Sequence, residues 1–239
     1  MPVLIFSAMP LIAEEVPNYA TADVIVSMDK KDNNKKSLGV EWGGGHTEEN
    51  WFMNLGIRMR EDIFDFAGNI GLKDSYFKNY PVQLGSTLEA YYHIRFIKIN
   101  VFEQNMFAAG SVFVDILPSN SRLTVYFGAG LKGNYLAVDA NNPPQWNAYP
   151  IVSIFLTQKF SNIIVLNAGL RTFSPFISTA FIEPQFFANI NINITPKITL
   201  ITGIEGIYNS YRKLEDLRDN TESLELQTLN FNAGIKYNF

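Results

Sequence analysis

Long segments in which apolar and polar residues alternate strictly are the feature that most constrains this fold. In the final segment, TLNFNAGIKYNF, every second residue from Leu229 to Phe239 is apolar, and the residues between them are Asn, Gly or Lys. A period of two indicates a β-strand with one apolar and one polar face. The same pattern recurs in residues 53–60, 62–73, 82–95, 123–134, 164–173, 186–194 and 198–208. The sequence therefore predicts an all-β fold.

The predicted strands are long, and their connections alternate between short and long. Most run for roughly nine to fourteen residues, enough to cross a bilayer obliquely, whereas soluble strands average about five to six. Short connections are expected at 118–121, 161–162 and 195–196, and long ones at 96–105, 137–148, 174–185 and 209–222. Short turns on one rim and long loops on the other are typical of outer-membrane barrels.

The strand number follows from ten segments between Trp51 and Phe239 and one further hairpin in residues 22–43. With both chain ends in the periplasm the number must be even. We expect twelve strands, with ten as the alternative. In the twelve-strand arrangement Trp42 and Trp51 flank one periplasmic turn and belong to an aromatic girdle at the membrane interface. The connection at residues 60–62 is unusually tight for an outer loop.

Charge decides which face meets lipid. On the best-patterned strands the apolar face carries no Asp, Glu, Lys or Arg, as a lipid-facing surface requires. A closed antiparallel transmembrane β-barrel also satisfies every backbone group in lipid. A soluble ligand-binding barrel with the faces exchanged fits the alternation equally well, but strand length, sorted connections and the aromatic end favour the membrane. The other face then forms a polar network in the lumen: Arg58, Asp65, Glu89, His93, Arg95, Lys132, Arg171, Glu205 and Lys236.

Composition narrows the class further. At 239 residues a single domain is expected, and only 18% of the residues are charged against a usual quarter. The net charge of −4 and the lack of a basic patch argue against nucleic acid, and the absence of cysteine excludes thiol chemistry. The apolar run Pro2–Ala13 is too short to span a membrane as a helix. We interpret residues 1–13 as a residual signal peptide and 14–239 as the barrel, the alternative being a buried N-terminal strand.

The segment GSVFVDILPSNSRLTVYFGAGLKG, residues 110–133, resembles the middle hairpin of small outer-membrane barrels of the OmpA, OmpX and opacity-protein type. NAGLRTF and NAGIKYNF resemble later strands of that group. The resemblance implies an outer-membrane location in a diderm bacterium. It also implies that the insertion machinery reads Phe239, with Tyr237 and Phe231 in support. Val125 departs from the group's pattern, where proline is common, and the expected strand number exceeds the eight that are typical there.

Few residues point to chemistry. Barrel lipases place His and Ser two residues apart on one strand, but the residues at that spacing from His93 are Tyr91 and Arg95. His46 with Glu48 and Glu49 could hold a metal, but a solvated turn is the plainer interpretation. We expect no cofactor and no metal.

Three functions remain open. The favoured one is a structural or surface-contact barrel whose extracellular loops bind an unknown ligand. The second is a narrow channel for small solutes, and the third is a barrel hydrolase using His93. In each case the expected partners are outer-membrane lipid and the insertion machinery.

Overall fold

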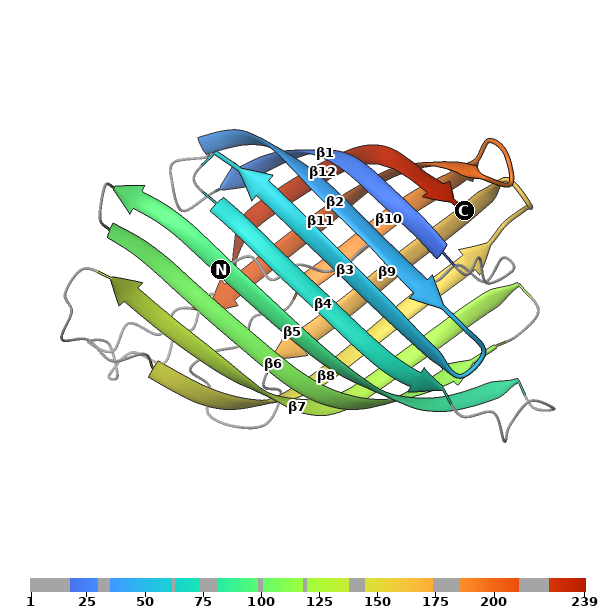
Figure 1. The fold of residues 1–239 in the computed structure, drawn as a ribbon, viewed down its shortest axis with the longest axis horizontal. Helices are drawn as coiled ribbons and strands as arrows, with labels where there is room; N and C mark the ends of the chain where they lie inside the picture. The colour runs from blue at the N-terminus through green and yellow to red at the C-terminus, as the bar shows by residue number, and fades with distance from the viewer. Residues whose placement is uncertain are drawn as a thin grey trace.

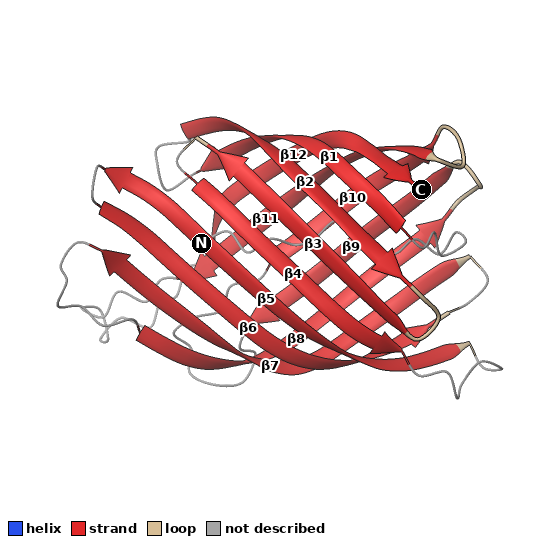
Figure 2. Cartoon of the chain, in the orientation of Figure 1, coloured by secondary structure: helices blue, strands red, loops and turns tan. Residues whose placement is uncertain are grey.

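The protein is a closed antiparallel barrel of twelve strands (Figures 1 and 2). The computed structural model describes residues 18–29, 35–61, 63–73, 81–98, 101–117, 120–137, 145–173, 185–210 and 224–239. This confirms the expected all-β transmembrane barrel fold and its larger strand number, while the predicted signal segment lies outside the described residues. The strands are β1 Asn18–Asp29, β2 Lys35–Thr47, β3 Trp51–Arg60, β4 Ile63–Lys73, β5 Val82–Lys98, β6 Val101–Ile116, β7 Ser121–Ala137, β8 Gln145–Lys159, β9 Ile164–Phe173, β10 Gln185–Asn193, β11 Ile198–Ser210 and β12 Leu224–Asn238.

Each strand pairs with its neighbours in sequence, and β1 pairs with β12 to close the barrel. Because the strand number is even, β1 begins and β12 ends on the same rim, where Phe239 N donates to Asn18 O at 3.0 Å. We call this the terminal rim. It also carries the turns at 48–50, 160–163 and 194–197 and the ends of β4 and β6 with the starts of β5 and β7, whereas the other strand ends lie on the opposite rim.

The sequence interpretation was wrong at residues 96–105, where it placed a long loop. β5 continues to Lys98 and β6 begins at Val101, with Phe96 paired to Phe102. The polar residues of this segment belong to β5, which extends past β4, and to β6, which stays paired with β7 as far as Phe102, so their polarity did not mark a loop. The tight connection between Arg60 and Ile63 is present as expected. The predicted loops at 137–148, 174–185 and 209–222 lie largely outside the described residues.

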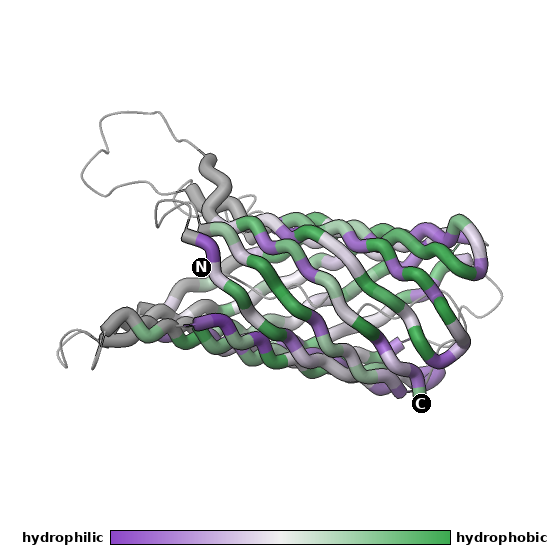
Figure 3. Tube along the Cα trace, turned by 90° about the horizontal axis from the view of Figure 1, so that it is seen from above, coloured by the Kyte–Doolittle hydropathy of each residue, from purple (hydrophilic) through white to green (hydrophobic). Residues whose placement is uncertain are grey.

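The two faces of the wall differ sharply. Outward side chains such as Leu55, Leu88 and Val112 are 44%, 65% and 60% exposed, whereas the residues that alternate with them are buried. Figure 3 shows this alternation as apolar and polar positions along the strands. An apolar outer surface around a closed backbone ladder suits hydrocarbon, which offers no hydrogen-bond partner.

Among the described residues no helix is long and apolar enough to cross a membrane.

An arginine on the outward face tests this assignment. We expect Leu55→Arg, in the middle of β3, to lower the free energy of unfolding by about 2–4 kcal/mol because it places a charge near the bilayer midplane. Leu72→Arg, at the end of β4 near the terminal rim, is the control and should cost about 0–1 kcal/mol. Urea unfolding in lipid vesicles, followed by tryptophan fluorescence, measures both. Equal losses at the two positions would contradict the membrane-facing assignment.

Trp42 does not lie beside the first terminal-rim turn as the sequence interpretation had it. β2 continues beyond Trp42 to Thr47, and Trp42 pairs with Ile57 within the wall. The cause is the run Gly43–Gly45, which resembles a turn but is strand. At Gly45 a Cβ atom would collide with the Asn54 and Tyr19 side chains, so a residue without a side chain fits there.

Trp51 begins β3 at the terminal rim. Its Nε1 donates to Glu48 Oε2 at 2.8 Å, and its ring centroid lies 4.8 Å from that of His46. His46 in turn contacts Asn18 Oδ1 at 2.7 Å and Glu48 Oε1 at 3.2 Å. Hydrogen bonds from Trp51 and His46 hold the pKa of the Glu48 carboxyl below its usual value. These contacts tie the starts of β1 and β3 together.

Candidate functional site in the barrel lumen

The inward face is polar, and the residues predicted for the lumen network lie on it. The side chains of Arg58, Asp65, His93, Arg171, Glu205 and Lys236 are buried, and Glu89 is partly buried. Arg95 and Lys132 belong to β5 and β7, but their side chains lie outside what the structure describes. The network divides into several groups of contacts rather than one.

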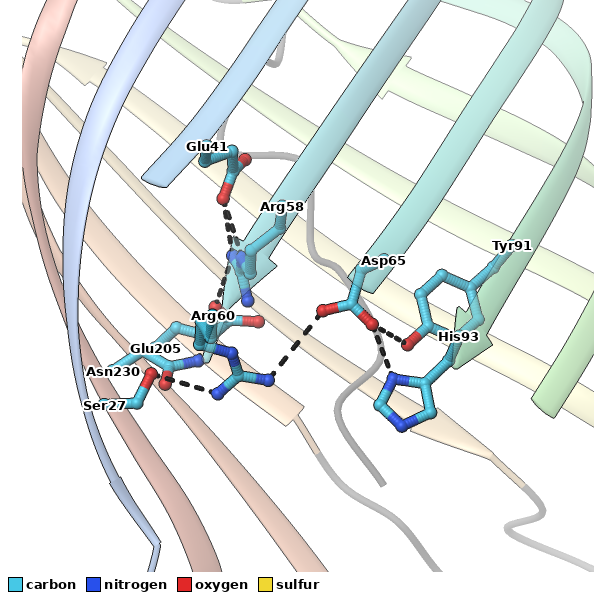
Figure 4. Close-up of polar contacts among 9 residues, drawn as sticks. All are labelled: Ser27, Glu41, Arg58, Arg60, Asp65, Tyr91, His93, Glu205 and Asn230. Atoms are coloured by element: carbon cyan, nitrogen blue, oxygen red, sulfur yellow. Dashed lines mark hydrogen bonds and ion pairs between the residues drawn. The ribbon is translucent and has the colours of Figure 1, made fainter. Parts of the chain in front are cut away.

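The largest group centres on Arg58 of β3 (Figure 4). Arg58 Nε donates to Glu41 Oε2 of neighbouring β2 at 2.8 Å, and Arg58 Nη2 donates to Glu205 Oε2 of β11 at 2.9 Å. Asn230 Nδ2 of β12 also donates to Glu205 Oε2, at 3.1 Å. Strands β2, β1 and β12 separate β3 from β11 in the wall, so the Arg58–Glu205 contact crosses the lumen. We call Arg58, Glu41 and Glu205 the Arg58 bridge.

A second group lies beside it, around Asp65 of β4 (Figure 4). Asp65 Oδ1 accepts a hydrogen bond from Tyr91 Oη at 2.9 Å and lies 2.5 Å from His93 Nδ1. Arg60 Nη2 lies 3.8 Å from Asp65 Oδ2, and Arg60 Nη1 donates to Ser27 Oγ at 3.0 Å. The Tyr91 hydroxyl therefore bonds Asp65, and the Ser27 hydroxyl bonds Arg60. Within the described cluster His93 contacts the Asp65 carboxylate, and neither hydroxyl group is hydrogen-bonded to it as a nucleophile would be.

A second salt bridge crosses the lumen between β9 and β5. Arg171 Nη2 donates to Glu89 Oε1, and the Arg171 guanidinium lies 5.4 Å from the centroid of the Phe107 ring. Strands β6, β7 and β8 separate the two partners in the wall. We call Arg171 and Glu89 the Arg171 bridge. The sequence predicted both residues for the lumen but not that they form a pair.

Lys236 belongs to a separate group of contacts, nearer the terminal rim. Its Nζ lies 4.3 Å from the centroid of the Tyr19 ring, and Tyr19 Oη donates to Asn54 Oδ1 at 2.6 Å. Asn54 Nδ2 then donates to Asn69 Oδ1 at 2.9 Å. A cation over an aromatic face is stabilised without a carboxylate partner. Asp115, the second-to-last residue of β6, lies near the same rim and pairs with Arg122 and Thr124.

Sequence analysis missed the aromatic residues of the lumen. Five of them form a row across β3, β6, β7, β8 and β10, in which successive ring centroids lie 6.2, 5.3, 5.4 and 5.7 Å apart. The sequence could have revealed these inward rings through their spacing from polar residues of the same strand, because residues two apart share a face. Phe113 precedes Asp115 and Phe187 precedes Asn189 in this way. The aromatic row consists of Phe52, Phe113, Tyr126, Phe155 and Phe187.

Glycines on neighbouring strands make room for these rings. A Cβ atom at Gly85 would collide with the Phe113 ring, and one at Gly169 would collide with the rings of Phe155 and Phe187. The inward face therefore alternates large rings with positions that lack a side chain. This packing places aromatic volume in the lumen without pushing the wall outward.

The described lumen is filled. Asp65, His93, Asn167 and Phe113 are 0%, 2%, 2% and 2% exposed, so these inward side chains are almost completely shielded from solvent. Beside the Arg58 bridge, Asn189 and Asn230 line a cavity of about 20 Å³. A cavity needs roughly 10–15 Å³ to hold one water. Twelve strands lie between the eight that side chains fill and the sixteen or more that leave a channel, and here side chains fill the part of the interior that the described residues enclose.

No group of three or more His, Cys, Asp or Glu side chains that could hold a metal ion occurs among the described residues. The charged residues of the Arg58 bridge, of the Arg171 bridge and of the Asp65 group contact one another, and Lys236 contacts an aromatic ring. The arrangement therefore supports electrostatic cross-bracing of the barrel rather than metal chemistry in the part of the chain that the structure describes.

Known structures share this architecture. The NanC porin superposes with a TM-score of 0.57 at 9% identity, covering 91% of this chain and all of the porin. The KdgM porin gives 0.51 at 7% identity, covering 92% of this chain and 99% of that one, and its complex with disordered oligogalacturonate gives 0.50. No protein-family model and no curated protein matches the chain.

At such low identity the likeness concerns the fold alone, and that fold is the membrane β-barrel of porins. The resemblance to outer-membrane barrels is thereby confirmed in its general form. The narrower resemblance to the small OmpA, OmpX and opacity-protein barrels finds no support among these neighbours, which are porins.

Proposed function

We propose that this protein is an integral outer-membrane barrel with a structural or surface-contact role, whose lumen does not conduct solutes in its resting state. The observation that carries the proposal is the filled lumen. Two salt bridges and an aromatic row occupy it, and most inward side chains of the described residues are buried. A barrel closed in this way offers rigidity and a platform for surface loops rather than a path.

Single-channel recording tests the proposal. We expect the purified, refolded protein to produce no discrete current steps in planar lipid bilayers, because no continuous aqueous path crosses the filled lumen. A general porin added at the same concentration is the positive control. Uniform, discrete steps from the heat-modifiable, folded protein would overturn the proposal and favour a channel.

A narrow channel is the second candidate, and a specific observation favours it. Arg58 Nη1, Asn189 Nδ2 and Asn230 Oδ1 line the cavity of about 20 Å³ and have no hydrogen-bond partner among the described residues. Buried polar atoms of this kind favour hydration. The fold likeness to the NanC and KdgM porins agrees with this candidate. Under it, the Arg58 bridge acts as the constriction that a solute must pass.

Insertion through the C-terminal strand is part of the same proposal. The aromatic residues of this strand face outward: Phe231, in the middle of β12, is 45% exposed, and Tyr237 and Phe239, at the terminal rim, are 40% and 67% exposed. Tyr237 and Phe239 pack edge to face, with ring centroids 5.1 Å apart. An exposed aromatic edge on the last strand suits recognition by the insertion machinery, with the terminal rim in the periplasm.

We expect Phe239→Ala to lower the fraction of the protein that reaches the outer membrane, because it removes the aromatic ring at the end of this edge. Ile235→Ala is the matched control, since Ile235 is also outward-facing on β12 and 51% exposed. Membrane fractionation and heat-modifiable migration on detergent gels measure both variants. Equal insertion of the two variants would remove Phe239 from the proposed signal.

A further inference from the structure

The barrel wall has a notch on the opposite rim, above the tight β3–β4 hairpin. β2 pairs with β3 only as far as Gly39, and β5 pairs with β4 only as far as Arg95, within the described residues. Beyond these points residues 35–38 pair with β1, and Phe96 pairs with β6. Figure 1 shows β5 and β6 extending past the hairpin. Beyond these points β2 and β5 each have one backbone edge that faces the notch and is not paired with a strand of the described residues.

An apolar groove of about 550 Å³ lies over this notch. Its lining is mostly apolar and includes Leu38, Val40, Met59, Phe64, Ile94 and Phe96, and its charged members are Arg60 and Glu61 at the β3–β4 connection. At its two sides Leu38 is 64% exposed and Phe96 55% exposed. The volume falls within the roughly 300–1,000 Å³ of small-molecule sites. Because Val40 and Met59 alternate with inward residues, the groove opens on the lipid-facing side of the wall.

We propose that this groove binds one acyl chain of a phosphate-bearing membrane lipid. The groove is continuous with the lipid-facing surface and apolar, so a hydrocarbon chain is the matching occupant. The free edges of β2 and β5 present backbone N–H and C=O groups, which need polar partners at a membrane surface. The ester and phosphate oxygens of a lipid supply acceptors there while its chain fills the groove.

Charge at the rim fits the phosphate. Lys36 is the next outward-facing position beyond Leu38 on β2, and its side chain is exposed. A cation at this position lies where a headgroup would rest when the chain occupies the groove. The inference depends on the barrel lying in a membrane and is independent of whether the lumen conducts.

Native mass spectrometry of the detergent-purified protein tests the inference, with palmitoyl-oleoyl phosphatidylglycerol as the probe. We expect one lipid to remain bound per barrel at concentrations where further lipids dissociate. Val40→Trp fills the groove and should weaken this binding at least about tenfold, equivalent to about 1.4 kcal/mol. β2 already carries the outward-facing Trp42, so the substitution suits its surroundings.

Val112→Trp is the matched control, because Val112 is 60% exposed on the lipid-facing side of β6 and does not line the groove. It should retain the lipid as the parent does, and heat-modifiable migration verifies that both variants are folded. Lys36→Gln should weaken binding of the anionic lipid severalfold. Retention by Val40→Trp equal to that of the parent and of Val112→Trp would overturn the inference. Unchanged binding by Lys36→Gln would overturn its headgroup part.

Discussion

Arg58→Ala will lower the free energy of unfolding by about 3–5 kcal/mol, because it leaves the buried carboxylates of Glu41 and Glu205 without their guanidinium partner. The side chains of Arg58, Glu41 and Glu205 are 4%, 8% and 9% exposed, so bulk solvent does not screen the two carboxylates that remain. Urea unfolding in lipid vesicles measures the loss through the fluorescence of Trp42 and Trp146.

A charge-free variant separates loss of the bridge from loss of packing. Arg58→Met combined with Glu41→Gln and Glu205→Gln removes all three charges while keeping side chains of similar size. It should recover most of the lost stability, since buried ion pairs are often replaceable by neutral groups. Lys197→Ala, at an exposed terminal-rim turn, is the control and should change stability by no more than about 0.5 kcal/mol. Equal losses in the single and triple variants would mean that the unpaired charge is not the cause.

Removing both salt bridges that cross the lumen will convert a silent barrel into a conducting one. The variant combines Arg58→Ala, Glu205→Ala, Arg171→Ala and Glu89→Ala with Glu41→Gln. Removing the charges together avoids unpaired buried groups, and the deleted side chains are those that reach across the lumen. We expect discrete current steps in planar bilayers from this variant and none from the parent.

The variant that lacks only Arg171 and Glu89 is the control, and it should stay silent because the Arg58 bridge still crosses the lumen. Heat-modifiable migration establishes that each variant has folded. If the variant with all five substitutions folded and still gave no current, the aromatic row alone would close the lumen. Current steps from the parent would instead show that the lumen already conducts.

Much of the fold could be predicted from the sequence because a strand residue's face follows from its position. The alternation around Arg58 and His93 predicted both as inward residues, and the structure places both there. The strand number followed from counting alternating segments. The interpretation failed where the local composition is typical of a turn or loop but the backbone pairs as a strand. The Gly43–Gly45 run resembles a turn but belongs to β2. The polar residues after Phe96 resemble a loop but belong to β5 and β6.

The contacts within the lumen could not be predicted in the same way. Which carboxylate Arg58 reaches depends on how far along the barrel axis each residue lies and on how the wall curves, and alternation contains neither quantity. Glu205 comes from β11, four strands away around the barrel, and only the closed structure shows that the two side chains meet. The inward rings were missed because hydropathy alone assigns Phe113 and Phe187 to the lipid-facing surface.

The pairing of β1 with β12 has a consequence for how the chain reaches its folded state. Every other pair of strands joins neighbours in sequence and can form as a hairpin, with a small cost in chain entropy. This single pairing, from Tyr19 with Asn238 to Asp29 with Thr228, unites the beginning and end of the described chain. Until it forms, the backbone edges of both strands are open to wrong partners, so the interval before closure is when aggregation threatens most.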